Sequence, residues 1–205
     1  MKVKRKYYPD EKIYRWLTPL LDAYKIHDQG LKSDLKKEPN KEQIACRKGC
    51  HSCCLQHAIP VNNFEVMGMA WFASQHISSL QRDKLISNIK HSRQSLACPF
   101  LVDESCSIYP VRPLACRGFH ILGNICEIGE DPIESRPGDI WFPSRNTTKK
   151  TAFAMMATVG IINHREKEQK FNDDFMLKIT KQLHEVEITE VLELIAKFDK
   201  KIAIE

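Results

Sequence analysis

The chain has 205 residues and a formal net charge of +5, and eight of its residues are cysteines. Its length predicts one domain, and its 42% apolar and 28% charged residues exclude wholesale disorder. The longest nearly apolar run, 152–162, is shorter than the roughly 20 residues of a membrane span, and the basic start lacks the apolar stretch of a signal peptide. We therefore expect a cytoplasmic protein that has no membrane contact. The basic clusters are short and scattered, so we also expect no nucleic-acid partner.

The N-terminal part of the chain, residues 1–43, is predicted to be helical. Asp10 is placed to cap a helix whose apolar residues recur every three or four positions up to Tyr24, with a kink at Pro19. The polar, lysine-rich stretch 30–40 is expected to be a connector.

Two further helices are expected between the first and second groups of cysteines. Asn62 is followed by Glu65 at the spacing of a capping box, and Ser78 with Gln81 repeats this signal. The apolar positions of the second helix are Leu85, Ile86, Ile89 and Leu96.

Proline and glycine are frequent in residues 98–143, which predicts loops and one short hairpin within 100–109. Helices return in the C-terminal part, 145–205, with one predicted over 152–162. Two apolar stripes are expected to be helical: Phe175, Met176, Ile179, Leu183 and Val186, then Val191, Leu192, Ile195, Phe198 and Ile202. No alternation of strand and helix is visible. We predict an all-α fold with helices packed around an irregular cysteine-rich metal-binding centre.

The cysteines lie in two blocks, with none in the first 45 residues and none in the last 79. A domain of this size in a reducing compartment does not need disulfides, so metal binding is the preferred interpretation. The first block would place its sulfurs on one side of a helical turn entered from a loop at Gly49. A zinc ion or a cubane iron–sulfur cluster takes four thiolates, so eight sulfurs allow two sites or one site with spares. The candidate ligands are Cys46, Cys50, Cys53, Cys54, Cys98, Cys106, Cys116 and Cys126.

Adjacent residues in a regular backbone point apart, so Cys54 is expected to serve a second site or to be a spare, and not to share an ion with Cys53. At least one more ligand must then come from the second block. The two blocks are therefore predicted to meet in space.

The pattern Cys46-Arg-Lys-Gly-Cys50-His-Ser-Cys53-Cys54 is followed by Cys98-Pro-Phe-Leu, by Cys106-Ser-Ile-Tyr-Pro-Val-Arg-Pro-Leu-Ala-Cys116-Arg-Gly-Phe, and by Cys126. This pattern resembles the YkgJ family, the CxxCxxCC family of zinc- or iron-chelating proteins, over residues 44–127. The first spacing is three residues where the family name has two. The resemblance implies a metal-binding core and a metal ion as partner, and flagellin lysine N-methylases carry a similar region. Metal identity and any protein partner stay open.

Other interpretations of the cysteines are weaker. Single buried cysteines can fill a core, but this spacing argues against that for the whole set. A thioredoxin-like dithiol at Cys50 and Cys53 lacks a preceding strand, and a radical-SAM cluster would need an α/β barrel. His51, His57 and His120 are expected to support the thiolates from outside the ligand set.

Two functions follow from these patterns. The first is a protein that holds zinc or an iron–sulfur cluster through the two cysteine blocks. The alternative is an iron–sulfur-dependent methyltransferase or redox enzyme similar to the flagellin lysine N-methylases, so enzymatic activity is left undecided. Its acid or base candidates would be Glu65, His57 and Tyr109, and Arg112 and Arg117 could support thiolates.

Overall fold

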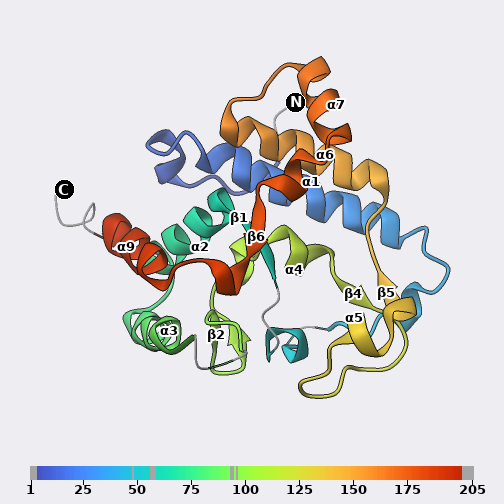
Figure 1. Ribbon diagram of the computed structural model, residues 1–205, viewed down its shortest axis with the longest axis horizontal. Helices are drawn as coiled ribbons and strands as arrows, with labels where there is room; N and C mark the ends of the chain where they lie inside the picture. The colour runs from blue at the N-terminus through green and yellow to red at the C-terminus, as the bar shows by residue number, and fades with distance from the viewer. Residues whose placement is uncertain (1–3, 48, 56–58, 93–94, 96, 200–205) are drawn as a thin grey trace.

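The computed structural model of the chain describes residues 4–47, 49–55, 59–92, 95 and 97–199, and it is mostly helical (Figure 1). The α-helices are α1 (Leu17–Leu35), α2 (Asn63–Gln75), α3 (Ser79–His91), α4 (Leu114–Gly118), α5 (Pro132–Ser135), α6 (Arg145–Met155), α7 (His164–Asn172), α8 (Phe175–Lys178) and α9 (Ile188–Asp199). Short 3-10 helices are η1 (Pro9–Lys12), η2 (Lys41–Gln43), η3 (Ser52–Leu55), η5 (Tyr109–Val111), η6 (Pro137–Asp139), η7 (Met156–Val159) and η8 (Leu183–Glu185). Within the described residues, no helix has the length and apolar character needed to cross a membrane.

Three short antiparallel strand pairs complete the fold, so the all-α prediction holds only in its coarse form of a mostly helical protein. They are β1 (Pro60–Asn62) with β6 (Thr180–Gln182), β2 (Leu101–Val102) with β3 (Ser105–Cys106), and β4 (His120–Ile121) with β5 (Ile140–Trp141). The β2–β3 pair confirms the hairpin predicted within 100–109.

Helices α1 and α6 lie side by side and form one layer of the molecule (Figure 1). Gly30 permits their close approach, because a Cβ at this position would lie 2.3 Å from Cγ2 of Thr147. The Thr147 hydroxyl donates to Asp34 at 2.7 Å, and the same carboxylate accepts from the backbone N–H of Ser144, the N-cap of α6, at 2.9 Å. A packed crossing and two hydrogen bonds thus join these helices.

The predicted N-terminal helix differs from the observed one at both ends. Helix α1 begins at Leu17 and continues to Leu35, so residues 30–35 are helical and not part of a connector. Pro19 lies in the first turn, where its missing N–H costs no hydrogen bond. Asp10 lies in η1, where its carboxylate accepts a hydrogen bond from Trp71 Nε1 at 2.7 Å.

Helix α2 packs against α9, with α3 beside them (Figure 1). The capping box of Asn62 and Glu65 is confirmed, and Ser78 caps α3 through the N–H of Gln81. Trp71 is fully buried in the shared core. The stripe on α9 is also confirmed, with Val191, Ile195 and Phe198 buried, while Leu96 and Ile202 lie outside the described residues.

Two C-terminal predictions need correction. The helix expected over 152–162 is present with other bounds: it begins earlier, at Arg145, and its last turn closes at Gly160, whose φ of 79° lies in the left-handed region. The stripe that starts at Phe175 forms only the four-residue α8, and the chain then becomes β6. Pairing with β1 provides hydrogen bonds that local periodicity does not reveal.

The cysteines lie on short elements and loops. We call residues 44–55 and 98–143 the cysteine region. Its α-helices, α4 and α5, have only five and four residues, in agreement with the expected density of helix-breaking residues.

Candidate metal centre

The two cysteine blocks contact each other directly. The backbone N–H of Cys98 donates to the carbonyl of Cys54 at 2.6 Å, and the N–H of Ala45 donates to the carbonyl of Ile121 at 2.8 Å. The chain segments that hold the first and second blocks are thus joined at two places.

The first block does not form the helical turn that its spacing suggested. Cys46 follows an extended bridge, Cys50 comes directly after Gly49, and Cys53 lies in η3 together with Cys54. Gly49 has a φ of 87°, a conformation that glycine adopts readily and that interrupts a helix. All eight cysteines are free thiols.

Cys53 and Cys54 lie next to each other in η3. The adjacent Cys54 thiol is the main cause that raises the pKa of Cys53, and burial adds to it. Whether Cys54 binds metal stays a prediction.

Four thiols, those of Cys53, Cys98, Cys106 and Cys116, lie near enough to one another that the charge on one thiolate would raise the pKa of the next. Charge on Cys53, Cys106 or Cys116 would raise the pKa of Cys98. In the same way, Cys53 and Cys106 raise the pKa of Cys116, and Cys53 raises that of Cys106. Burial is the largest cause that raises the pKa of Cys98, Cys106 and Cys116, so these three thiols favour their neutral form until a cation compensates them. We call these four residues the inner set.

Three other thiols form a second group that overlaps the first through Cys53. Charge on Cys50, Cys53 or Cys126 would raise the pKa of Cys46, and charge on Cys50 would raise the pKa of Cys126. Cys50 is exposed, whereas Cys46 and Cys126 are half-buried. We call these three residues the outer set. The inner residue Cys53 acts on Cys46 and therefore links the two sets.

Hydrogen-bond donors reach several of the sulfurs. The backbone N–H of Ile121 donates to Cys46 Sγ at 3.4 Å, and Arg136 Nη2 donates to Cys126 Sγ at 3.3 Å. In the inner set, the backbone of Phe100 bonds the Cys98 sulfur and the backbone of Ile108 bonds the Cys106 sulfur. Both bonds act against burial, because each lowers the thiol pKa that burial raises. Such donors stabilise a thiolate and orient it as a ligand.

Glu65 positions the helix that holds Cys116. Its buried carboxylate accepts from the backbone N–H of Leu114, at the start of α4, at 2.8 Å. The other oxygen accepts from the backbone and the side chain of Asn62 at 3.1 and 2.9 Å. The pKa of Glu65 is raised to about 7, because the effect of burial outweighs that of these hydrogen bonds, which lower it. Sequence reasoning identified its capping role and missed its contact with α4.

Arg117 is a second anchor of the same helix, and only 3% of its surface is exposed. Its guanidinium donates to both carboxylate oxygens of Asp28 on α1 at 2.9 Å and stacks over the ring of Tyr24, 4.4 Å from its centroid. It also donates to the carbonyls of Pro110 and Arg112. Arg117 thus holds the loop before Cys116 against α1 and does not bond a sulfur.

The other polar candidates differ in how they are satisfied: among the described residues, the buried Nδ1 of His120 has no hydrogen-bond partner. Arg112 stacks over exposed Tyr109, with its guanidinium carbon 4.0 Å from the ring centroid. His51 Nδ1 lies 3.3 Å from the carbonyl of Gly49, and His120 packs against Trp141. His57 lies outside the described residues.

A hollow of about 350 Å³ opens beside the outer set. It is lined by Arg47, Gly49, Cys50, His51, Ser52 and Ile125. Cys50 is the outer thiol that borders this space, so an ion bound there would be reachable from it.

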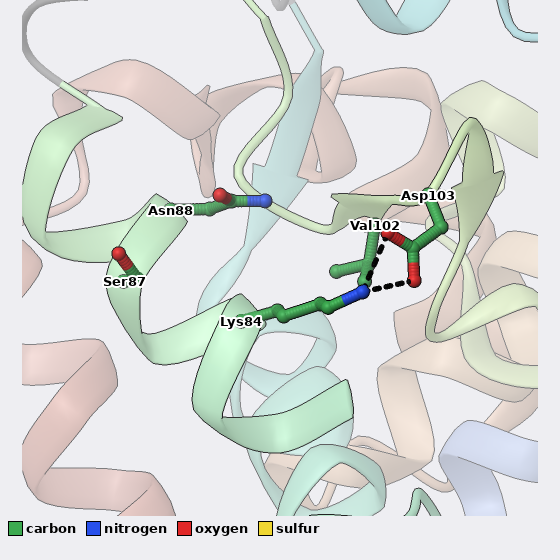
Figure 2. A pocket seen from close by; sticks show the side chains of 5 residues that line it. All are labelled: Lys84, Ser87, Asn88, Val102 and Asp103. Atoms are coloured by element: carbon green, nitrogen blue, oxygen red, sulfur yellow. Dashed lines mark hydrogen bonds and ion pairs between the residues drawn. The ribbon is translucent and has the colours of Figure 1, made fainter. Parts of the chain in front are cut away.

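A second hollow, of about 200 Å³, lies between α3 and the β2–β3 hairpin (Figure 2). Lys84 extends across it and donates to both carboxylate oxygens of Asp103 at 2.8 and 2.7 Å. Asn88 donates to the carbonyl of Leu101 at 2.8 Å. These bonds hold the hairpin of Cys106 against α3, and the polar groups that form them already have partners.

The described residues contain no group of three or more His, Cys, Asp and Glu side chains that is already in metal-binding geometry. The chemistry of the donors nevertheless fits a thiophilic metal, because free thiols gather in two sets with N–H donors to their sulfurs.

Comparison with known proteins agrees with the cysteine pattern. The model of the family CxxCxxCC, described as "Putative zinc- or iron-chelating domain", matches residues 45–137. The match confirms the resemblance seen in the sequence. It includes all eight cysteines and the whole of α4. No curated protein and no solved structure matches the chain.

Proposed function

We propose that this protein binds zinc or an iron–sulfur cluster through its two cysteine blocks. The observation that supports the proposal most is the contact between the blocks, in which Cys98 bonds Cys54 and Ala45 bonds Ile121. Sulfurs that are about 44 or more residues apart in sequence are thereby available to one centre, as a four-thiolate ion requires.

The energetics of the buried thiols also support a bound cation. Three buried or half-buried sulfurs of the inner set, in Cys98, Cys106 and Cys116, have no cationic side chain bonded to them, and burial raises the pKa of each. A metal ion would stabilise them as thiolates and would release their protons on binding. The metal would also join the hairpin, α4 and η3.

The enzymatic alternative has less support from the site. A methyltransferase or redox enzyme needs an acid or base that faces a substrate space, yet Glu65 is saturated by hydrogen bonds and Tyr109 is exposed on η5. We therefore favour metal binding as the function and leave catalysis as the second candidate.

Elemental analysis of anaerobically purified protein, together with its visible absorption spectrum, tests the proposal. We expect bound zinc in a colourless sample or iron with sulfide in a brown one, at one equivalent or more per chain. A Cys98→Ser variant should lose metal, while a Ser107→Ala variant in the same hairpin serves as the matched control. Protein that contains no zinc or iron, and takes up neither on reconstitution, would refute the proposal.

A further inference from the structure

We propose that the loop of residues 124–136, with its exposed isoleucines, is a docking surface for a partner protein that presents apolar side chains together with lysine or arginine. The loop lies at one edge of the molecule and contains α5 (Figure 1). The inference concerns side chains that bind no metal in our account, so it stands apart from the proposed function.

The loop is closed by its own polar side chains. Arg136 donates to the carbonyl of Asn124 at 2.9 Å, which joins the two ends, and to Glu130 Oε1 at 2.7 Å. Glu130 also accepts from the Ser135 hydroxyl at 2.8 Å and, through its other oxygen, from the backbone N–H of Glu127 at 2.9 Å. The segment is thus a compact Ω-loop, a kind of loop that is frequently functional. Because these bonds already fix its shape, little ordering entropy opposes the binding of a partner.

The apolar side chains of this loop are exposed, whereas two of its charged side chains are turned inward. Ile125, Ile128 and Ile133 are 52%, 86% and 57% exposed. The side chains of Glu130 and Arg136 are only 17% and 18% exposed. Isoleucine is usually buried and glutamate and arginine are usually exposed, so the arrangement is reversed here. Exposed apolar side chains that gather in one place, with polar residues around them, mark interaction sites.

The hollow of about 350 Å³ described above reaches this surface, because Ile125 is one of its lining residues. A recess beside an exposed apolar side chain gives a partner's own apolar side chain a place to be buried. Such buried side chains provide most of the binding energy of protein interfaces.

The charge around the isoleucines selects the class of partner. Residues 124–139 contain one cation, Arg136, and five carboxylates, which gives a formal net charge of −4 in a chain whose total is +5; the carboxylates are Glu127, Glu130, Asp131, Glu134 and Asp139. Glu127 and Glu134 are exposed and have no ion-pair partner among the described residues. An acidic surface repels nucleic acids and anionic lipid headgroups. A protein segment with Lys or Arg beside its apolar side chains complements both features of the loop.

Binding of synthetic peptides to the full chain, followed by two-dimensional NMR, tests the proposal. The probe is a helical peptide of leucine and lysine, and two control peptides replace its lysines by glutamate or its leucines by serine. We expect only the probe to bind, with the largest amide shift changes in residues 124–139. Higher salt should weaken the binding, because it screens the exposed carboxylates.

Variants of the chain test whether the isoleucines carry the binding. The double variant Ile128→Ser, Ile133→Ser should weaken binding of the probe about tenfold or more, because it removes apolar area that the partner would bury. Leu80→Ser is the matched control, since Leu80 on α3 is 66% exposed and lies outside the loop. This variant should bind the probe as tightly as the unaltered chain does.

Four results would overturn the inference: failure of the probe to bind, shift changes centred outside the loop, equal binding by the double variant, or binding of phosphatidylserine vesicles through the loop. Sedimentation velocity tests the remaining occupant, a second copy of the chain. Self-association that the double variant abolishes would assign the surface to that copy and would also overturn the inference. None of these results depends on metal content, so the proposed function is tested separately by elemental analysis.

Discussion

The helical part of the molecule and the cysteine region are stabilised by different means. Helices α1, α2, α6 and α9, which we call the helical scaffold, bury large apolar side chains such as Trp71 and Leu20 completely. The cysteine region contributes Phe100, Val102, Ile108 and Val111 to the same buried core, but the rest of it has short elements, backbone contacts between loops, and exposed apolar residues such as Ile128 and Phe142. Apolar burial can fold the scaffold and hold the hairpin against it, whereas in our account the remainder of the cysteine region also depends on metal.

Polar anchors add to the apolar core that the two parts share. Arg117 reaches α1 through Asp28, and Glu65 of α2 holds the start of α4. The scaffold thus orients the cysteine region through these hydrogen bonds as well as through the shared core. The difference teaches that mutations in the two parts should have separable effects on stability and on metal content.

The largest effect is expected inside the scaffold. Trp71→Ala removes a fully buried indole that stacks edge-on with Tyr8, 5.1 Å between ring centroids, and should lower the free energy of unfolding by about 3–5 kcal/mol. Trp71→Phe is the matched control, because it keeps an aromatic ring and loses the hydrogen bond to Asp10, and should cost less. Urea unfolding followed by circular dichroism measures both. Equal losses in the two variants would contradict this account of the core.

The next effect is expected at the anchor between the parts. Arg117→Met leaves Asp28 and two carbonyls without their donor and should cost about 2–3 kcal/mol, less than a fully buried pair because Asp28 is partly exposed. The variant should also lower metal content, since the loop before Cys116 is released. Arg82→Met, which breaks the more exposed pair with Asp199, should cost below about 1 kcal/mol and keep the metal. Unchanged metal content in Arg117→Met would argue against an anchoring role.

A smaller, pH-dependent effect is expected at His27 on α1. Burial lowers the pKa of His27 to about 4, below its ordinary value of 6.5, so the folded state binds fewer protons than the unfolded state. Stability present above pH 6.5 should therefore be lost as the pH falls toward 4, by about 1–2 kcal/mol at pH 5. His27→Gln cannot titrate, so its unfolding free energy should fall less between pH 7.5 and pH 5. Identical pH profiles for the two proteins would refute this assignment.

The smallest effect is expected at Arg136. Arg136→Gln removes the guanidinium that donates to Cys126 Sγ and should weaken metal binding by about tenfold or less, because the sulfur keeps its place in the outer set. Competition with a chelator of known affinity measures the change. The unfolding free energy of the scaffold should stay the same, and a large loss there would show that Arg136 supports the fold rather than the site.

Local signals in the sequence predicted a substantial part of the fold. The capping pairs at Asn62 and Ser78 depend on residues three positions apart, and both helices begin where these pairs predicted. The apolar stripe of α9 and the hairpin of Cys106 are local as well. The sequence also led to the family that matches the cysteine region.

Features that depend on distant contacts were not predictable in this way. Helix α1 continues through Gly30 because α6 packs closely there, and β6 forms because β1 lies beside it. The burial of Arg117 requires Asp28 from another helix. The division of the thiols into inner and outer sets likewise depends on the paths of loops, which spacing alone does not fix.

Hydrogen exchange with and without bound metal tests the central contrast between the two parts most directly. In the metal-loaded protein, backbone amides of the scaffold and of residues 98–143 should both be protected. After chelation, we predict that residues 98–143 lose most of their protection while α1, α2 and α6 keep theirs, because only the cysteine region depends on the metal. Equal protection of residues 98–143 in both states would contradict the account.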